Sequence, residues 1–161
     1  MAETPSHLDA DGRAHMVDVG EKAVTDRTAR ATATVRLQPE TAAQVAKGGL
    51  SKGDVAAVAR IAGIQAAKRT PELLPLCHHV ALASVDVVVD VDTAAGTITM
   101  ASTARAADRT GVEMEALTAA SVAALTVYDM VKSVERGATI TDVALEEKAG
   151  GRSGRWQRAP G

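Results

Sequence analysis

Asp129 and Lys132 are the two residues of this 161-residue sequence whose types and spacing best suit proton transfer. They lie three positions apart in a stretch predicted to be helical, so both side chains project from one face of that helix. The same face carries Ser121, Val122 and Leu125, which makes it apolar apart from one carboxylate and one amine. Such a setting can shift both pKa values for acid–base catalysis. An i,i+3 ion pair on a solvated face has the same spacing, and both interpretations stay open.

Two stretches could hold phosphate groups. Lys52 stands in SKGD at the start of a predicted helix, where backbone N–H groups and the helix dipole attract anions. The glycine-rich residues 148–154, KAGGRSG, could wrap an anion with backbone amides and with Arg152. A surface lysine and a frayed chain end are the alternatives, because the sequence has no phosphate-binding loop of the G-x-x-x-x-G-K type.

Two further pairs of side chains could contact a ligand. Glu113 and Glu115 open the long predicted helix, where carboxylates are favoured by the dipole whatever the function. Cys77 and His78 lie in a proline-containing loop that leads into a strand. A packed cysteine beside a hydrogen-bonded histidine is the simpler interpretation of this pair, because no other motif of the sequence has metal-ligand spacing. The sequence therefore predicts no metal site.

Periodicity and turn residues predict the elements that must position these side chains. Alternating or valine-rich runs predict strands, while Pro39, paired glycines and Thr70-Pro71 bound the helices. The turn TAAGT at 93–97 joins two strands in a hairpin. The tail from residue 149 is too rich in Gly and Arg to predict regular structure. The predicted elements are strand 29–37, helices 39–47 and 55–69, strands 80–91 and 97–106, helix 113–135 and strand 139–148.

This order predicts an α+β fold of ferredoxin-like type, a split β-α-β arrangement with a four-stranded antiparallel sheet and an extra helix. We expect one domain over residues 1–161, with flexible ends at 1–14 and 152–161. The apolar stretch 116–131 is interrupted by polar residues and is too short to predict a membrane span. The long helix should face the sheet with an apolar stripe, formed by Leu117, Ala120, Ala124, Val127, Val131 and Val134.

The composition excludes several classes of protein. The net charge is only −2 and the sequence holds one Trp and one Tyr, so neither duplex binding nor base stacking on single strands is expected. The single cysteine, Cys77, excludes an intrachain disulfide and fits a reducing cytoplasm, and the sequence shows no export signal. A core of small Ala and Val side chains buries little area per residue, so we expect an oligomer.

Four stretches of the sequence resemble, in order, the MoaC family of cyclic pyranopterin monophosphate synthases. They are MVDVGEKAVTDRTARA, KGDVAAVARIAGIQAAKRTPELLPLCH, RTGVEMEALTAASVAALTVYDMVKSVER and EEKAGGRSG. The resemblance covers most of residues 7–155. Within it, the run TGVEMEALTAASVAALTVYDM is too long and unusual for a chance match.

The resemblance implies the second step of molybdenum cofactor biosynthesis. In this lyase reaction (8S)-3′,8-cyclo-7,8-dihydroguanosine 5′-triphosphate, a cyclic guanine nucleotide, rearranges to cyclic pyranopterin monophosphate and releases pyrophosphate. The resemblance also implies a homohexamer, a trimer of dimers with sites at subunit contacts. No cofactor is implied, and whether Mg²⁺ accompanies the triphosphate stays open, because the sequence shows no carboxylate cage for it.

The resemblance further implies a set of site residues. Its catalytic positions fall on Asp129, Lys132 and Lys52, with Asp129 as acid or base and Lys132 tuning its pKa or shuttling protons. His78 and Glu115 would hold the pterin-forming part of the substrate. The triphosphate would be neutralised by cationic side chains, namely Lys52, Arg27, Lys22 and Lys148. The substrate-binding positions as a set are Lys22, Arg27, Leu76, Cys77, His78, Glu113, Met114 and Glu115.

One residue departs from the family's pattern. The family usually has Pro directly after the Cys-His pair, where this sequence has His79, which removes a φ restraint and adds a titratable group. The rigidity of this loop and the placement of His78 therefore stay open. Two other functions fit the same fold: a regulatory module that binds the nucleotide without releasing pyrophosphate, and a structural oligomer in which nothing depends on Lys52 or Asp129.

Overall fold

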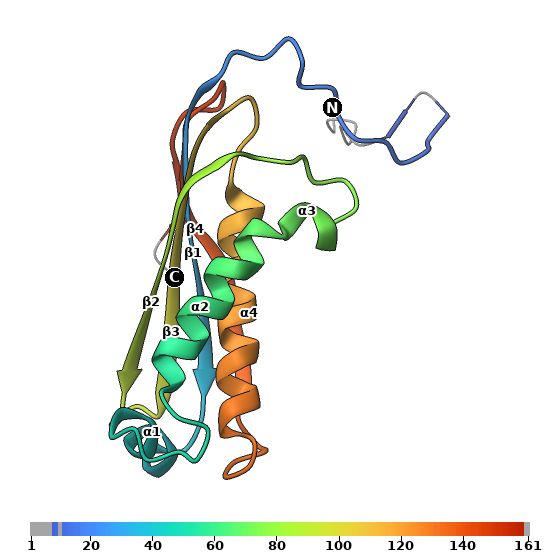
Figure 1. Ribbon diagram of the computed structural model, residues 1–161. Helices are drawn as coiled ribbons and strands as arrows, with labels where there is room; N and C mark the ends of the chain where they lie inside the picture. The colour runs from blue at the N-terminus through green and yellow to red at the C-terminus, as the bar shows by residue number, and fades with distance from the viewer. Residues whose placement is uncertain (1–7, 10, 160–161) are drawn as a thin grey trace.

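The computed structural model describes residues 8, 9 and 11–159, and within them five antiparallel strands form one sheet with helices on one of its faces (Figure 1). The strand order is β2-β3-β1-β4-β5, so the first strand lies in the middle of the sheet. The elements are β1 Thr25–Arg36, α1 Pro39–Ala46, α2 Val55–Lys68, α3 Thr70–Leu73, β2 Leu82–Asp92, β3 Thr97–Asp108, α4 Glu113–Val131, β4 Thr139–Ala149 and β5 Trp156–Gln157. This is the predicted α+β architecture of ferredoxin-like type.

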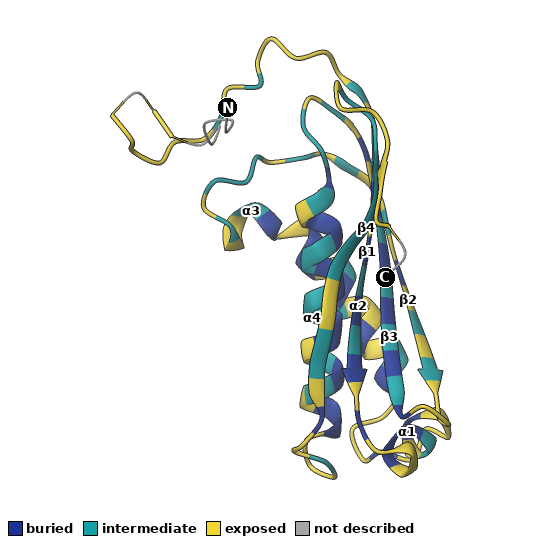
Figure 2. Cartoon of the chain, turned by 180° about the vertical axis from the view of Figure 1, so that it is seen from behind, coloured by how far each residue is buried: buried dark blue, intermediate teal, exposed yellow. Residues whose placement is uncertain are grey.

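Alternation along β1 explains why the sheet buries one face. Ala29, Ala31, Ala33 and Val35 are fully buried, and the residues between them are polar and point to the opposite face. α4 packs on β1, β3 and β4, while α2 packs on α4 and β2. Figure 2 shows buried residues along β1 and β3 in the middle of the sheet. The core is therefore built from small side chains, as the composition predicts.

A glycine lets α2 and α4 approach each other closely. A Cβ atom at Gly63 would lie 2.9 Å from the carbonyl oxygen of Ala119 and 3.1 Å from Cγ2 of Val87. The carboxylate of Asp54 begins α2 by accepting a hydrogen bond from the amide of Ala57 at 2.9 Å. The two helices run antiparallel, so the start of α2 lies beside the end of α4 (Figure 1).

Two short elements were not predicted. The sheet has a fifth strand, β5, which lies in the tail where the sequence predicts no regular structure. The short helix α3 directly follows α2, where the sequence predicts that a helix ends and a loop begins. Elements of two and four residues are too short to show a periodicity of their own. β5 forms because the edge strand β4 offers unpaired backbone groups to the chain that follows it.

The long helix α4 ends four residues earlier than predicted. After Val131 the chain turns, and the amides of Val134 and Glu135 both donate to the carbonyl of Val131. Val134 is therefore 53% exposed and does not extend the apolar stripe. Among the described residues α4 alone is long and apolar enough to cross a membrane, but half of its apolar window is buried in this domain, as in a core helix. Of the predicted stripe, Ala120, Ala124, Val127 and Val131 are buried and Leu117 is half-buried.

Candidate active site

The carboxylate of Asp129 lies between two lysines. Its Oδ1 is 2.6 Å from Nζ of Lys132, and its Oδ2 is 3.0 Å from Nζ of Lys52. The Lys52 amine also donates to the backbone carbonyl of Asp129 at 2.7 Å. Asp129 lies in the last turn of α4 and Lys132 caps that helix, where cations are favoured by its dipole. The structure thus brings all three predicted catalytic residues together, which we call the Asp129 triad.

Both lysines stabilise the charged form of Asp129. The hydrogen bond from Lys132, followed by that from Lys52, lowers the pKa of the Asp129 carboxyl below its ordinary value. The same hydrogen bond raises the pKa of Lys132. The side chain of Asp129 is 56% exposed, and Leu125 on the same helix face is exposed as well, so in one chain the predicted apolar neighbourhood is open to solvent. Asp129 is therefore held as a carboxylate at neutral pH, and its two ion pairs make it a weaker base than a free aspartate.

A second group of predicted residues surrounds a hollow of about 760 Å³ at the other end of α4. The loop after α3 and the first turn of α4 form its walls. Glu115 lies beneath this wall, only 2% exposed, with its Oε1 accepting from the thiol of Cys77 at 3.9 Å. The lining includes five of the predicted substrate-binding residues, Leu76, Cys77, His78, Glu113 and Met114. We call this space the apolar hollow.

The Glu115 carboxyl is the most unusual group near the apolar hollow. Among the described residues its Oε2 has no hydrogen-bond partner. Burial, followed by the negative charges of Glu113 and Asp108, raises the pKa of Glu115 above its ordinary value. Burial first, and Glu115 second, raise the pKa of the Cys77 thiol to about 11. Cys77 is therefore a neutral hydrogen-bond donor rather than a nucleophile, and it donates to Glu115, which lines neither this hollow nor the larger one that adjoins it.

His78 is fixed by the segment that precedes β1. Its Nε2 lies 2.6 Å from the backbone carbonyl of Val17, and because a carbonyl only accepts, Nε2 carries the hydrogen. His78 is half-buried, whereas His79, which replaces the usual proline of the family's pattern, is exposed and lies outside the lining of the hollow. The loop therefore places His78 at the hollow without a proline at the next position.

A larger hollow of about 1110 Å³ adjoins the first one, and we call it the cationic hollow. Lys22 and Arg27, both predicted to bind substrate, line it together with Arg109 and Arg152, beside the acidic Asp18 and Glu21. The Arg27 guanidinium donates from Nε to the carbonyl of Asp108 at 3.1 Å and from Nη2 to that of Arg109 at 3.0 Å. Thr110 and Gly111 line both hollows, so an anionic group and an attached ring could bind side by side.

Arg109 is the site residue that sequence reasoning missed. In the sequence it begins the stretch RTGVEME, and no local pattern gives it a role. In the structure its Nε donates to the carbonyl of Lys22 at 3.1 Å, and its side chain lines the cationic hollow. Its position directly before TGVEME was the available signal. Lys148, predicted to face the triphosphate, lies outside the lining and donates to the hydroxyl of Ser153.

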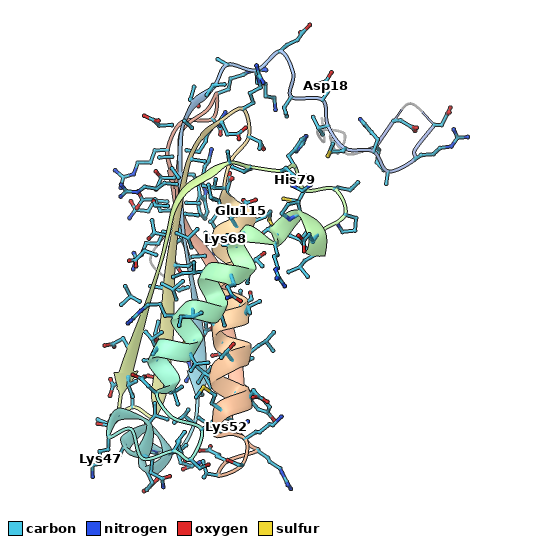
Figure 3. The ribbon with its side chains drawn as sticks, in the orientation of Figure 1. Asp18, Lys47, Lys52, Lys68, His79 and Glu115 are labelled. Carbon is cyan, nitrogen blue, oxygen red and sulfur yellow. The ribbon has the colours of Figure 1, made fainter. Side chains whose placement is uncertain are left out.

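The predicted site residues of one chain fall into two separate groups. The Asp129 triad lines neither hollow, and Asp129 lies 16 positions after Glu113 on α4. At 1.5 Å per residue this separation is roughly 24 Å along the helix axis. Figure 3 shows Glu115 near one end of α4 and Lys52 at the other. A single chain therefore cannot apply both groups to one small substrate.

Comparison with known proteins agrees with the resemblance of the sequence. The sequence model of the MoaC family matches residues 16–151. A protein of Geobacter sulfurreducens named cyclic pyranopterin monophosphate synthase is 55% identical over 156 residues, covering 97% of this chain and 98% of that protein. A synthase of the same name from Herpetosiphon aurantiacus is 56% identical over 152 residues, 94% of this chain and 93% of that protein. Cyclic pyranopterin monophosphate synthase 2 of Mycobacterium tuberculosis is 55% identical over 153 residues, 95% of this chain and 90% of that protein. The chain belongs to the MoaC family.

Proposed function

We propose that this chain is a cyclic pyranopterin monophosphate synthase, a phosphorus–oxygen lyase of molybdenum cofactor biosynthesis. It converts (8S)-3′,8-cyclo-7,8-dihydroguanosine 5′-triphosphate to cyclic pyranopterin monophosphate and pyrophosphate. Relatives at 55% identity over nearly the whole chain carry this name. The observation that carries the proposal is the pair of adjoining hollows, one with four cationic side chains and one lined by His78 and largely apolar side chains.

The two hollows suit the two parts of this substrate. The triphosphate lies in the cationic hollow, where Lys22, Arg27 and the two further arginines offset its charge and the charge that develops as pyrophosphate leaves. The purine-derived ring lies in the apolar hollow, where His78 orients the ring and the buried Glu115 supports the wall through its contact with the Cys77 thiol.

A second copy of the chain completes the site. The Asp129 triad lies too far along α4 to reach a substrate in its own chain's hollows, so the partner's triad supplies the acid–base groups. Val58, Ile61 and Leu125 are large apolar side chains left exposed on α2 and α4, a surface that a second copy can cover. We place the active form as a homohexamer, a trimer of dimers with sites at the subunit contacts.

Asp129 acts as the base in this scheme. Its carboxylate accepts a proton while the ring opens and recloses, and the two lysines that lower its pKa in the free chain must turn to the substrate for it to do so. Lys132 and Lys52 stabilise the negative charge that develops on the substrate, because both amines already lie within hydrogen-bond distance of one carboxylate. The reaction needs no cofactor of the chain's own, and we place it in the cytoplasm, which suits both the single cysteine and a reduced substrate.

Pyrophosphate release tests the proposal directly. The purified chain is incubated with the cyclic nucleotide triphosphate, and pyrophosphate and the pterin product are measured over time. Stoichiometric release of pyrophosphate supports the synthase. Binding of the nucleotide without release would identify a regulatory module, and neither binding nor release a structural oligomer. Repeating the assay after chelation and after adding Mg²⁺ shows whether the metal accompanies the triphosphate.

A further inference from the structure

The end of the described chain folds back along the edge of the sheet. β5 pairs with β4 through Lys148 with Trp156 and Glu147 with Gln157, and the amide of Arg158 donates to the carbonyl of Glu146 at 2.8 Å. The family match ends at residue 151, so β5 lies outside the matched region.

The Arg158 side chain anchors this strand to the sheet. Its Nε donates to the carbonyl of Leu145 at 2.9 Å and lies 3.7 Å from Oε2 of Glu146, and its guanidinium lies 5.9 Å from the centre of the Trp156 ring. Oε1 of Glu146 accepts from the hydroxyl of Thr32 on β1 at 2.8 Å. Glu146 itself is the extra residue of a β-bulge opposite β1. Arg158 is thus tied to β4 and, through Glu146, to the middle of the sheet.

The loop between β4 and β5 forms one wall of the cationic hollow. Gly151, Arg152 and Ser153 line this hollow. Gly151 has a φ of +71° and lies so close to the guanidinium of Arg27 that a Cβ atom there would collide with it. Three of the five residues of loop 150–154 are glycines, so the loop has many conformations to lose unless both of its ends are held. β4 holds one end and β5 holds the other.

We propose that β5 is a clasp for loop 150–154, with Arg158 as a positioning residue that keeps Arg152 directed at the polyphosphate of the substrate. Arg158 lies outside the lining of both hollows, so it acts on the affinity for the anion and not on the chemical step. The identity of the polyphosphate rests on the proposed function, whereas the effect of the clasp on anion binding can be measured without turnover.

Arg158→Ala tests the clasp in the full-length chain. Inorganic pyrophosphate binding is measured by calorimetry, and KM and kcat are measured with the cyclic nucleotide triphosphate. If the released loop holds its binding shape about one tenth of the time, Kd for pyrophosphate and KM each rise about tenfold while kcat is unchanged. Arg158→Lys keeps a cation beside Glu146 and should recover part of both values. Arg36→Ala is the matched control. Arg36 ends β1 and pairs with Asp142 near the start of β4, so this change removes another exposed ion pair at a distance from β5.

Three results would overturn the clasp. They are unchanged Kd and KM in Arg158→Ala, an equal rise in Arg36→Ala, and a fall in kcat without a change in Kd. A thermal melt of each variant separates these results from loss of the fold. A wild-type chain that releases no pyrophosphate from the nucleotide contradicts the proposed function instead, and the pyrophosphate titration then still decides whether β5 shapes an anion site.

Discussion

At the residue scale, spacing along the sequence predicts some contacts of the site but not others. Residues three apart on a helix face each other, so the contact between Asp129 and Lys132 follows from their positions alone. Lys52 is 77 residues from Asp129, and the contact between the two depends on the antiparallel packing of α2 and α4. Only the family resemblance could therefore group Lys52 with Asp129 and Lys132. Arg109 joins the cationic hollow through the end of β3, a placement that no local pattern indicates.

Asp129→Asn tests the base. Asn keeps the shape of the side chain but cannot accept a proton at neutral pH, so we expect kcat to fall by roughly 10²–10⁴-fold, the usual share of a general base. The melting temperature should change little, because both ion pairs of Asp129 are largely exposed and such pairs contribute little to stability. Steady-state pyrophosphate release measures kcat, with Asp142→Asn as the control for another exposed carboxylate in an ion pair. Full turnover by Asp129→Asn would remove Asp129 from the mechanism.

Glu115→Gln tests the buried carboxyl through the pH dependence of stability. Folding raises the pKa of Glu115, so the Glu115 carboxyl loses its proton at a lower pH in the unfolded chain than in the folded chain. The stability of the wild type therefore falls as the pH rises from the unfolded pKa towards the folded pKa. Gln is neutral at every pH. We therefore expect the variant to melt above the wild type at pH 8, with the difference vanishing near pH 4, as followed by thermal melts. A variant that melts below the wild type at pH 8 would contradict the burial of an unpaired charge.

At the element scale, most strands and helices follow from periodicity, whereas their ends follow from contacts that the sequence does not state. The alternation in β1 and the alanine pattern of α4 predict both elements and their buried faces. The end of α4 at Val131 and the pairing of β5 depend on neighbouring backbone groups, so neither was predictable. The close approach of α2 and α4 at Gly63 is likewise visible only in the assembled fold.

Gly63→Ala tests this approach. In an exposed helix the change would stabilise the chain, but here the added methyl group meets the backbone of α4, so we expect the free energy of unfolding to fall by about 1–3 kcal/mol. Urea denaturation measures it. Gly137→Ala, where the space around a Cβ atom is open, is the control and should be close to neutral. An increase in stability in Gly63→Ala would show that the two helices can separate without cost.

At the scale of the whole molecule, α4 separates the two groups of site residues. The two hollows lie at its first turn and the Asp129 triad at its last, and each group is complete in its own chain. In the proposed function, the hollows of one chain are its binding end, the Asp129 triad is its proton-transfer end, and the two ends serve different substrate molecules. Catalysis by this account requires that the binding end of one copy meets the proton-transfer end of another.

Mixing two inactive variants measures this requirement directly. Asp129→Asn removes the proton-transfer end and His78→Ala damages the binding end, so each variant alone should release little pyrophosphate. If the site spans two copies, subunits exchanged at equal amounts should recover about a quarter of wild-type turnover, because half of the randomly formed dimers are mixed and each has one intact site of two. Differently tagged subunits verify that mixed assemblies have formed. If the site lies within one chain, these mixed assemblies will be as inactive as the two parent variants, and that result would contradict the account.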